Sequence, residues 1–188
     1  LYRRIAAAKE QNPAMKVVVI DPRRTATCDL ADLHLAIAPG SDAFVFNGLL
    51  RYLKQNDCLD NDYIEQHTEG FEAAIEQAMS LSQEELEQTI AVKPEDLETF
   101  YRWFADTEKS ITFYSMGINQ SATGTDKCNA IINCHLATGR VGKPGAGPFS
   151  ITGQPNAMGG REVGGLANML AAHMDYSPDT IATVSEFW

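Results

Sequence analysis

The sequence lacks the features of several common protein classes. No apolar run in its 188 residues reaches the ~20 residues that a membrane-spanning helix needs. No apolar run follows the Arg3–Arg4 pair either, so we find no signal peptide. Basic residues are few, 15 against 25 acidic ones, and this net charge of −10 argues against a general nucleic-acid binder. Acidic residues cluster between Asp57 and Glu108, which indicates a solvated helical surface rather than a function.

Cysteine is scarce, and its spacing excludes one class of site. None of the four cysteines forms a C-x-x-C pair, so we expect no zinc or iron–sulfur site built from this chain alone. They are better explained as small hydrophobic side chains in a reducing compartment. The four are Cys28, Cys58, Cys128 and Cys134. His135 lies in an apolar helical pattern without a ligand-like spacing to another histidine, so we expect a hydrogen-bonded core or interface histidine.

An initiating methionine, internal repeats and low-complexity tracts are also missing. The chain begins within a helical pattern and stops at Trp188, so we expect a segment of a longer protein. Its composition is that of an ordinary folded domain, with 44% hydrophobic and 21% charged residues.

Alternating strand and helix patterns are present. "KVVVID" (16–21) predicts a strand buried on both faces of a parallel sheet, "HLAIAPG" (34–40) a second strand and "ITFYSMG" (111–117) another core strand. This order predicts an α/β, layered Rossmann-like fold with a mainly parallel sheet and helices on both faces. We expect residues 1–188 to form one domain.

Helix signals fill the remainder of the pattern. We expect helices over 1–10, 41–55 and 126–139, and a helical segment at about 60–108. Ser41 or Asp42 is placed to cap the second of these, Ser82 and Glu85 form a capping box, and Pro94 suits a first helical turn. We expect a polar loop after residue 117 and a long Gly/Pro-rich loop over 141–165, followed by a helix near 163–173.

Polar segments follow the predicted strands, where parallel sheets bind ligands. In "DPRRT" the Asp21 carboxylate can accept hydrogen bonds from a base or ribose, and Arg23, Arg24 and Thr25 can hold phosphate oxygens. A strand-ending turn with two surface arginines explains the same residues equally well. No G-x-G-x-x-G follows, which counts against an ordinary NAD fold. Asp42 has two interpretations as well, a second acidic contact or a helix cap.

Two later segments suggest binding. Gly117, Asn119, Gln120 and Ser121 offer backbone and amide donors at a strand end, which turn chemistry alone explains less readily. In "TGQPNAMGGREVGG" (152–165), glycines on both sides of Arg161 would let its guanidinium reach into a crowded site and hold a small oxyanion. Gln154 is a neutral donor candidate, and Lys143 is the alternative anion ligand, although an exposed, merely solvated lysine is also consistent.

Two long blocks and a short trailing segment carry a resemblance to a known family. They are "VVVIDPRRTATCDLADLHLAIAPGSD", "YSMGINQSATGTDKCNAIINCHLATGRVGKPGAGPFSITGQPNAMGGREVGG" and "EFW". These segments resemble the molybdopterin oxidoreductases of the dimethyl sulfoxide reductase family. The resemblance covers about residues 1–55 and 110–188, and it is closest to the catalytic subunits of bacterial assimilatory nitrate reductases. It implies oxygen-atom transfer from nitrate at a molybdenum bis(molybdopterin guanine dinucleotide). It further implies an iron–sulfur cluster and an electron donor outside this chain, and a cytoplasmic location.

The resemblance also assigns residues. It places one guanosine and its phosphates along two segments and the pterin beside two further side chains. These are Asp21, Pro22, Arg23, Arg24, Thr25, Gly40, Ser41 and Asp42 for the nucleotide, and Met116 and Gln120 for the pterin. It places Gln154 and Arg161 at the nitrate, with Glu162 a candidate to orient Arg161.

The sequence departs from the family in what it omits. Nothing here matches the family's molybdenum ligand, its N-terminal cluster motif or its C-terminal pterin-covering domain, so we expect one internal domain that neither holds molybdenum nor reduces nitrate alone. Two alternatives stay open. The parent enzyme could be another molybdopterin oxidoreductase that acts on formate or a different small oxyanion, although formate dehydrogenases more often carry an arginine where this chain has Thr152. A non-catalytic nucleotide-binding or interaction module on the same scaffold would also fit.

Overall fold

The computed structural model describes residues 1–163 and 170–187, apart from the side chain of Arg161. The chain divides into two compact units, Leu1–Phe149 and Ser150–Trp188. Most of the described helices and all of the described strands begin in the first unit.

The first unit alternates strands and helices before a helical stretch. Its first part holds α1 (Tyr2–Gln11), β1 (Val18–Ile20), a 3-10 helix η1 (Ala26–Leu30), β2 (Leu33–Leu35) and α2 (Asp42–Gln55). Four helices follow: α3 (Asn61–His67), α4 (Phe71–Met79), α5 (Gln83–Ile90) and α6 (Pro94–Asp106). The unit ends with β3 (Ile111–Tyr114), α7 (Met116–Asn119), α8 (Gly124–Ala137) and most of β4 (Gly147–Ser150).

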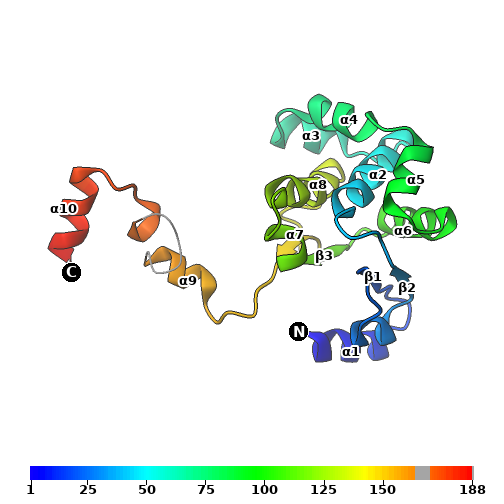
Figure 1. Cartoon of the computed structure of the whole chain (residues 1–188), viewed down its shortest axis with the longest axis horizontal. Helices are drawn as coiled ribbons and strands as arrows, with labels where there is room; N and C mark the ends of the chain where they lie inside the picture. The colour runs from blue at the N-terminus through cyan, green and yellow to red at the C-terminus, as the bar shows by residue number, and fades with distance from the viewer. Residues whose placement is uncertain (164–169, 188) are drawn as a thin grey trace. The chain divides into compact units, whose positions relative to one another are not determined.

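β1 and β2 form the parallel pair that the sequence predicts (Figure 1), with Val18, Val19 and Ile20 opposite Leu33, His34 and Leu35. The α/β fold is therefore confirmed. The described strands make two two-stranded sheets, β1–β2 and β3–β4. The prediction that β1 is buried on both faces is wrong, because every residue of β1 is only half-buried. Side chains of a strand point to the two faces of its sheet, so half-burial at every position means that neither face of β1 is completely covered.

The core of this unit lies among the helices. α2 packs against α8, α4, α5 and α6, and Figure 1 shows these helices grouped beside the β1–β2 pair. Leu49, Leu53, Ile90 and Ile131 are almost completely buried between them. Burying an aliphatic side chain of this size contributes about 1.5–3 kcal/mol of folding free energy, so this cluster holds α2 and α8 together.

The helix-end predictions have mixed outcomes. The Ser82–Glu85 capping box at α5 and Pro94 in the first turn of α6 are both confirmed. The predicted side-chain cap of α2 is wrong, because neither Ser41 nor Asp42 bonds the backbone there. Ser41 occupies the N-cap position, but its hydroxyl donates to the carbonyl of Ala38 at 2.7 Å.

Two predicted loops contain regular structure. The polar segment after β3 forms the short helix α7, and the Gly/Pro-rich stretch contains β4 and α9 (Ala157–Glu162). Gly139, Gly142 and Gly145 lie in the turns between α8 and β4 and have positive φ, as does Gly147 at the start of β4. β3 is not a core strand, because Ile111 and Phe113 are exposed and only Thr112 and Tyr114 turn inward. Its alternating burial is that of a strand covered on one face.

The second unit is small. It holds α9, a 3-10 helix η2 (Ala171–His173) and α10 (Pro178–Phe187). α9 and η2 contact each other. Most of the helix predicted near 163–173 lies outside the described residues.

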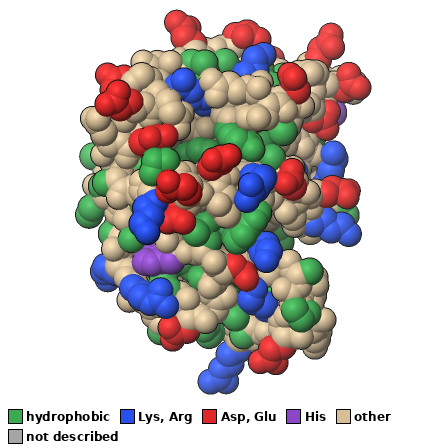
Figure 2. All heavy atoms as spheres, turned by 90° about the vertical axis from the view of Figure 1, so that its right-hand side faces the viewer, with side chains coloured by type: hydrophobic (Ala, Val, Ile, Leu, Met, Phe, Trp, Pro, Cys, Tyr) green, Lys and Arg blue, Asp and Glu red, His purple; other side chains and the backbone are tan. Residues whose placement is uncertain are grey.

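No helix in the part of the chain that the structure describes is long and apolar enough to cross a membrane. Figure 2 shows acidic side chains gathered at the end of one face where α4 and α5 lie, with hydrophobic side chains between the charged ones. This agrees with the expected solvated helical surface, since α5 carries Glu84 and Glu85 in its first turn, and Glu85 is exposed.

Candidate functional site

The segment after β1 places polar groups at the carboxyl end of the parallel pair. Asp21 N donates to the carbonyl of Leu35 at 3.2 Å, which joins this segment to the end of β2. The Asp21 carboxylate accepts from the backbone N–H of Arg23 at 2.7 Å and lies 3.5 Å from the guanidinium Nε. This local turn fixes the carboxylate at the strand end, while 82% of the Arg23 side chain is exposed. Pro22 and Arg24 are exposed as well, and Thr25 is half-buried.

The segment after β2 leads into the first turn of α2. Gly40 has φ +91, a conformation that side-chain-bearing residues rarely adopt, and a Cβ there would meet nothing within 4 Å. Asp42 is the first residue of α2. Its Oδ2 lies 2.9 Å from Nζ of Lys127 in α8. The cap interpretation of Asp42 is therefore wrong, and its carboxylate belongs to an ion pair between two helices.

The segment after β3 lies beside the N-terminal end of α8. Met116 opens α7 and is 58% exposed, and Gln120 follows α7 and is also exposed. α7 contacts both β3 and α8. Gly124 is required where α7 meets α8, because a Cβ there would overlap the backbone carbonyl of Asn119. This close approach holds Met116 and Gln120 next to the start of α8.

The predicted nitrate-binding residues belong to the second unit. Gln154 is exposed in a bend, and its backbone N–H donates to the Thr152 hydroxyl at 3.2 Å. Arg161 is in α9, and its side chain lies outside the described part of the structure. Glu162 contacts Nε2 of His173 at 2.7 Å, so this carboxylate joins α9 to η2. The role of Glu162 in orienting Arg161 stays a prediction.

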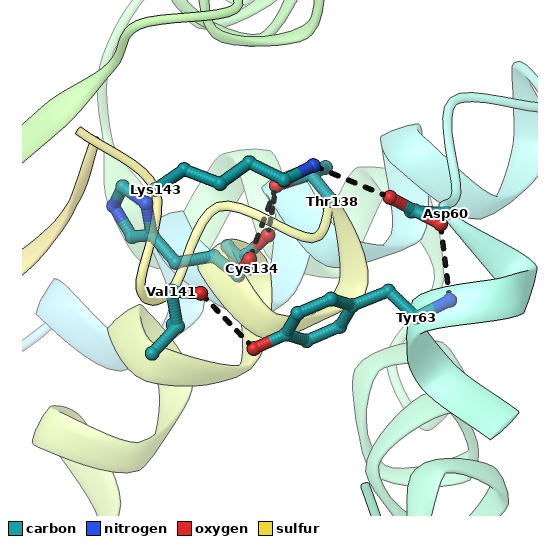
Figure 3. A network of polar contacts seen from close by, with 7 residues as sticks. Asp60, Tyr63, Cys134, Thr138, Val141 and Lys143 are labelled. Atoms are coloured by element: carbon teal, nitrogen blue, oxygen red, sulfur yellow. Dashed lines mark hydrogen bonds and ion pairs between the residues drawn. The ribbon is translucent and has the colours of Figure 1, made fainter. Parts of the chain in front are cut away.

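Lys143, the alternative anion ligand, takes part in a network around the turn after α8 (Figure 3). Its Nζ lies 3.6 Å from Asp60, whose carboxylate also caps α3 by accepting from Tyr63 N. The Tyr63 hydroxyl donates to the carbonyl of Val141. A cavity of about 500 Å³ lies here, lined by Asp60, Asp62, Glu108 and Lys143 among others. Because acidic groups outnumber Lys143 and the buried Arg140 in the lining, this cavity does not favour an anion.

His135 has the expected core position. It is fully buried, and its Nε2 lies 2.8 Å from the Thr112 hydroxyl. Burial, and to a smaller extent the charge of Arg140, together lower the pKa of His135 from 6.5 to about 4. All four cysteines are free, and Cys28 and Cys134 are buried. No group of three or more potential metal ligands occurs among the described residues.

The first unit thus brings two of the predicted cofactor segments together through α8. Residues 40–42 contact α8 through Lys127, and residues 116–120 adjoin its first turn. Sequence reasoning missed Lys127. The helical spacing Lys127, Ile131 and Cys134 (i, i+4 and i+7) gave the signal, because it places the lysine on the buried face of α8.

These residues suit a phosphate-bearing nucleotide cofactor. Exposed guanidinium groups at a strand end are the donors that phosphate oxygens accept from. The backbone at Gly40 and Gly117 is open, since a Cβ at either position would meet nothing within 4 Å, so a flat ligand can approach it closely.

Comparison with known proteins identifies the family. The model of a family described as molybdopterin oxidoreductase matches residues 1–185. The chain is 53% identical over its whole length to 21% of a nitrate reductase from Klebsiella oxytoca, and 50% identical over its whole length to 20% of one from Shewanella frigidimarina. It is also 30% identical, over its whole length, to 28% of the F420-dependent formate dehydrogenase subunit alpha of Methanocaldococcus jannaschii.

A solved structure agrees with these relatives. Acetylene hydratase from Pelobacter acetylenicus superposes on 72% of this chain with a TM-score of 0.57 and 25% identity, and the match covers 18% of the hydratase. The chain spans about a fifth of the length of the two nitrate reductases that it matches. With a family match over nearly every residue, an α/β fold that confirms the sequence prediction and strand-end segments suited to a nucleotide, the chain belongs to the molybdopterin oxidoreductase family.

Proposed function

We propose that residues 1–188 are the molybdopterin guanine dinucleotide-binding domain of a larger molybdenum enzyme that reduces nitrate to nitrite. One observation carries this proposal: two proteins named nitrate reductase are at least 50% identical to this chain over its whole length. Because the chain spans about a fifth of those proteins, other parts of the parent polypeptide supply the metal ligand and an iron–sulfur cluster. A separate protein or domain acts as electron donor.

The residues of the first unit bind and orient the cofactor. The Asp21 carboxylate, fixed at the strand end by the N–H of Arg23, accepts hydrogen bonds from the guanine or its ribose. The exposed guanidinium groups of Arg23 and Arg24 hold phosphate oxygens, assisted by Pro22 in shaping the turn and by Thr25. The open backbone at Gly40 and the adjoining Ser41 and Asp42 form the second contact segment.

Two further pairs of residues act closer to the reaction. Met116 and Gln120, both exposed beside α8, line the pterin. Arg161 binds the nitrate anion and Gln154 donates a hydrogen bond to it. Nitrate takes up two electrons and two protons and leaves as nitrite and water, and the bound molybdenum supplies the electron-pair transfer. The chain's own contribution is to hold an anion in a fixed orientation in a site sheltered from water.

Arg161→Lys in the full-length enzyme tests the substrate role. A lysine keeps the charge but loses the planar pair of donors that suits an oxyanion, so we expect kcat/KM for nitrate to fall about 10²–10³-fold, the cost of losing one oxyanion donor. Molybdenum content should stay unchanged. Lys143→Met is the control, because it removes a cation that is already paired with Asp60 and to which we assign no contact with nitrate. An unchanged kcat/KM in Arg161→Lys would leave Arg161 with a structural role only.

The formate alternative has support of its own, since a formate dehydrogenase subunit is 30% identical over the whole chain. Thr152, in the place of an arginine that such enzymes more often carry, favours nitrate. Assaying the full-length enzyme with both anions decides between them. We propose a cytoplasmic location, which the four free cysteines suit because reducing compartments keep thiols unpaired. The chain alone is expected to show no nitrate turnover.

A further inference from the structure

Lys127 is a buried charge whose ion-pair partner among the described residues comes from a distant part of the chain. The residue is 7% exposed, and its Nζ lies 2.9 Å from Oδ2 of Asp42, 85 residues earlier. Moving an ammonium group out of water is costly unless a counter-charge compensates it. The position of Lys127 therefore depends on the Asp42 carboxylate, and the orientation of that carboxylate depends on Lys127.

The pair joins the two segments of the first unit that we assign to the cofactor. Asp42 opens α2 directly after Gly40 and Ser41. Lys127 is the fourth residue of α8, and its backbone N–H donates to Thr123 in the turn that connects α8 to the 116–120 segment. The ion pair thus connects the nucleotide segment to the first turns of α8, the helix that adjoins the pterin segment.

The packing of α2 on α8 does not need this pair. Leu49, Leu53 and Ile131 are buried at this interface, and the Cys134 thiol donates to the carbonyl of Phe46 at 3.2 Å. Apolar side chains at such a place hold helices together at least as well as an ion pair does. A charged pair adds a fixed carboxylate direction, which apolar contacts cannot give. Lys127 contacts Oδ2 of Asp42. Since a carboxylate accepts hydrogen bonds at both oxygens, Asp42 keeps acceptor sites for a ligand while it is paired with Lys127.

We propose that Lys127 is a positioning residue for the cofactor. It holds the Asp42 carboxylate in the direction required for the nucleotide, at the end of α8 that adjoins segment 116–120. The inference rests on the proposed function of this domain.

The test uses the full-length enzyme purified with its cofactor, and measures guanine nucleotide and molybdenum per polypeptide during dialysis. In Lys127→Met we expect cofactor release to accelerate about 10-fold to 100-fold, the range for residues that orient a ligand-binding group. Lys127→Arg, which keeps the charge, should restore most of the retention. Ile131→Val is the matched control: it removes a buried methylene from α8, lowers Tm, and should leave release unchanged. Equal release from Ile131→Val and Lys127→Met, or wild-type release from Lys127→Met, would overturn the inference.

A double-mutant comparison covers the case in which Lys127→Met alone fails to fold. Asp42→Asn/Lys127→Met leaves neither charge buried. Because Lys127 acts through Asp42, the double variant should release cofactor as fast as Asp42→Asn alone, and additive acceleration would contradict this. Failure of the proposed cofactor binding gives a different result, since the wild-type enzyme would then contain neither guanine nucleotide nor molybdenum. A substrate other than nitrate would leave the release measurement unchanged.

Discussion

The burial of His135 makes the stability of this chain depend on pH in a defined window. The folded protein binds a proton at His135 only near pH 4, whereas the unfolded chain binds it near pH 6.5. The unfolded state therefore holds more protons between these values, and the free energy of unfolding decreases as the pH falls through this window. The full difference is about 3 kcal/mol, because one pKa unit corresponds to about 1.4 kcal/mol. Above pH 6.5 the contribution is complete.

The structure gives the reason for this shift. The imidazole is enclosed, with the ring of Phe104 at 5.1 Å and the Thr112 hydroxyl at 2.8 Å from Nε2. Its Nδ1 has no hydrogen-bond partner among the described residues, and the guanidinium of Arg140, which packs over the same Phe104 ring, disfavours a second positive charge. Protonation of His135 would therefore bury a second positive charge beside Arg140. The Nδ1–H of the charged ring would also have no hydrogen-bond acceptor among the described residues.

Urea unfolding at pH 7 and at pH 5, followed by circular dichroism, measures the effect. We expect wild type to lose about 2 kcal/mol between these pH values through His135. His135→Gln, which cannot be protonated, should lack this loss, whereas His67→Gln removes an exposed histidine and should keep it. Burial raises the pKa of Asp32, but hydrogen bonds from Lys9 and Val17 outweigh it and leave the pKa below 3.8. The Asp32 contribution is therefore lost only below the measured window. Equal losses in wild type and His135→Gln would refute the reasoning.

Two further predictions concern buried contacts. The Tyr101 hydroxyl is buried without a hydrogen-bond partner among the described residues, so Tyr101→Phe should leave the free energy of unfolding unchanged or raise it by about 1 kcal/mol; a clear loss in a urea titration would reveal a partner for the hydroxyl. Gly139 and Gly142 share positive φ, but a Cβ at Gly139 would overlap the Asp60 carboxylate, whereas one at Gly142 would meet nothing within 4 Å. Gly142→Ala should cost about 1 kcal/mol for the left-handed backbone and Gly139→Ala about 2–3 kcal/mol; equal costs would show that Asp60 moves aside freely.

Local sequence signals predicted much of the fold. The capping box at Ser82 and Glu85 and the first-turn Pro94 depend on neighbouring residues only, and both predictions are confirmed. The errors arise where a distant residue decides. The cap interpretation of Asp42, one of two left open, is wrong because the partner of its carboxylate is 85 residues away. The prediction that β1 is buried on both faces is wrong because composition alone cannot show what covers the faces of a strand.

The candidate site was predictable only where it depends on neighbouring residues. The strand-end position of Asp21 and Arg23 followed from a β-branched run and the polar turn after it. The link between segments 40–42 and 116–120 did not follow, because it depends on how α2 packs against α8. Lys127 lies within a stretch that the sequence predicts only as a helix, and its spacing from Ile131 is the sequence signal that places it on the buried face.

Because Cys134 is enclosed, its rate of chemical labelling can measure how often the first unit opens. Its thiol is completely buried between α8 and the backbone of α2, and burial raises its pKa far above the usual range. The thiolate is the reactive form, so an alkylating reagent cannot modify Cys134 while α2 and α8 stay together. Half-buried Cys58 and Cys128 should react first. The rate at which Cys134 is then labelled reports how often the two helices that carry Asp42 and Lys127 separate.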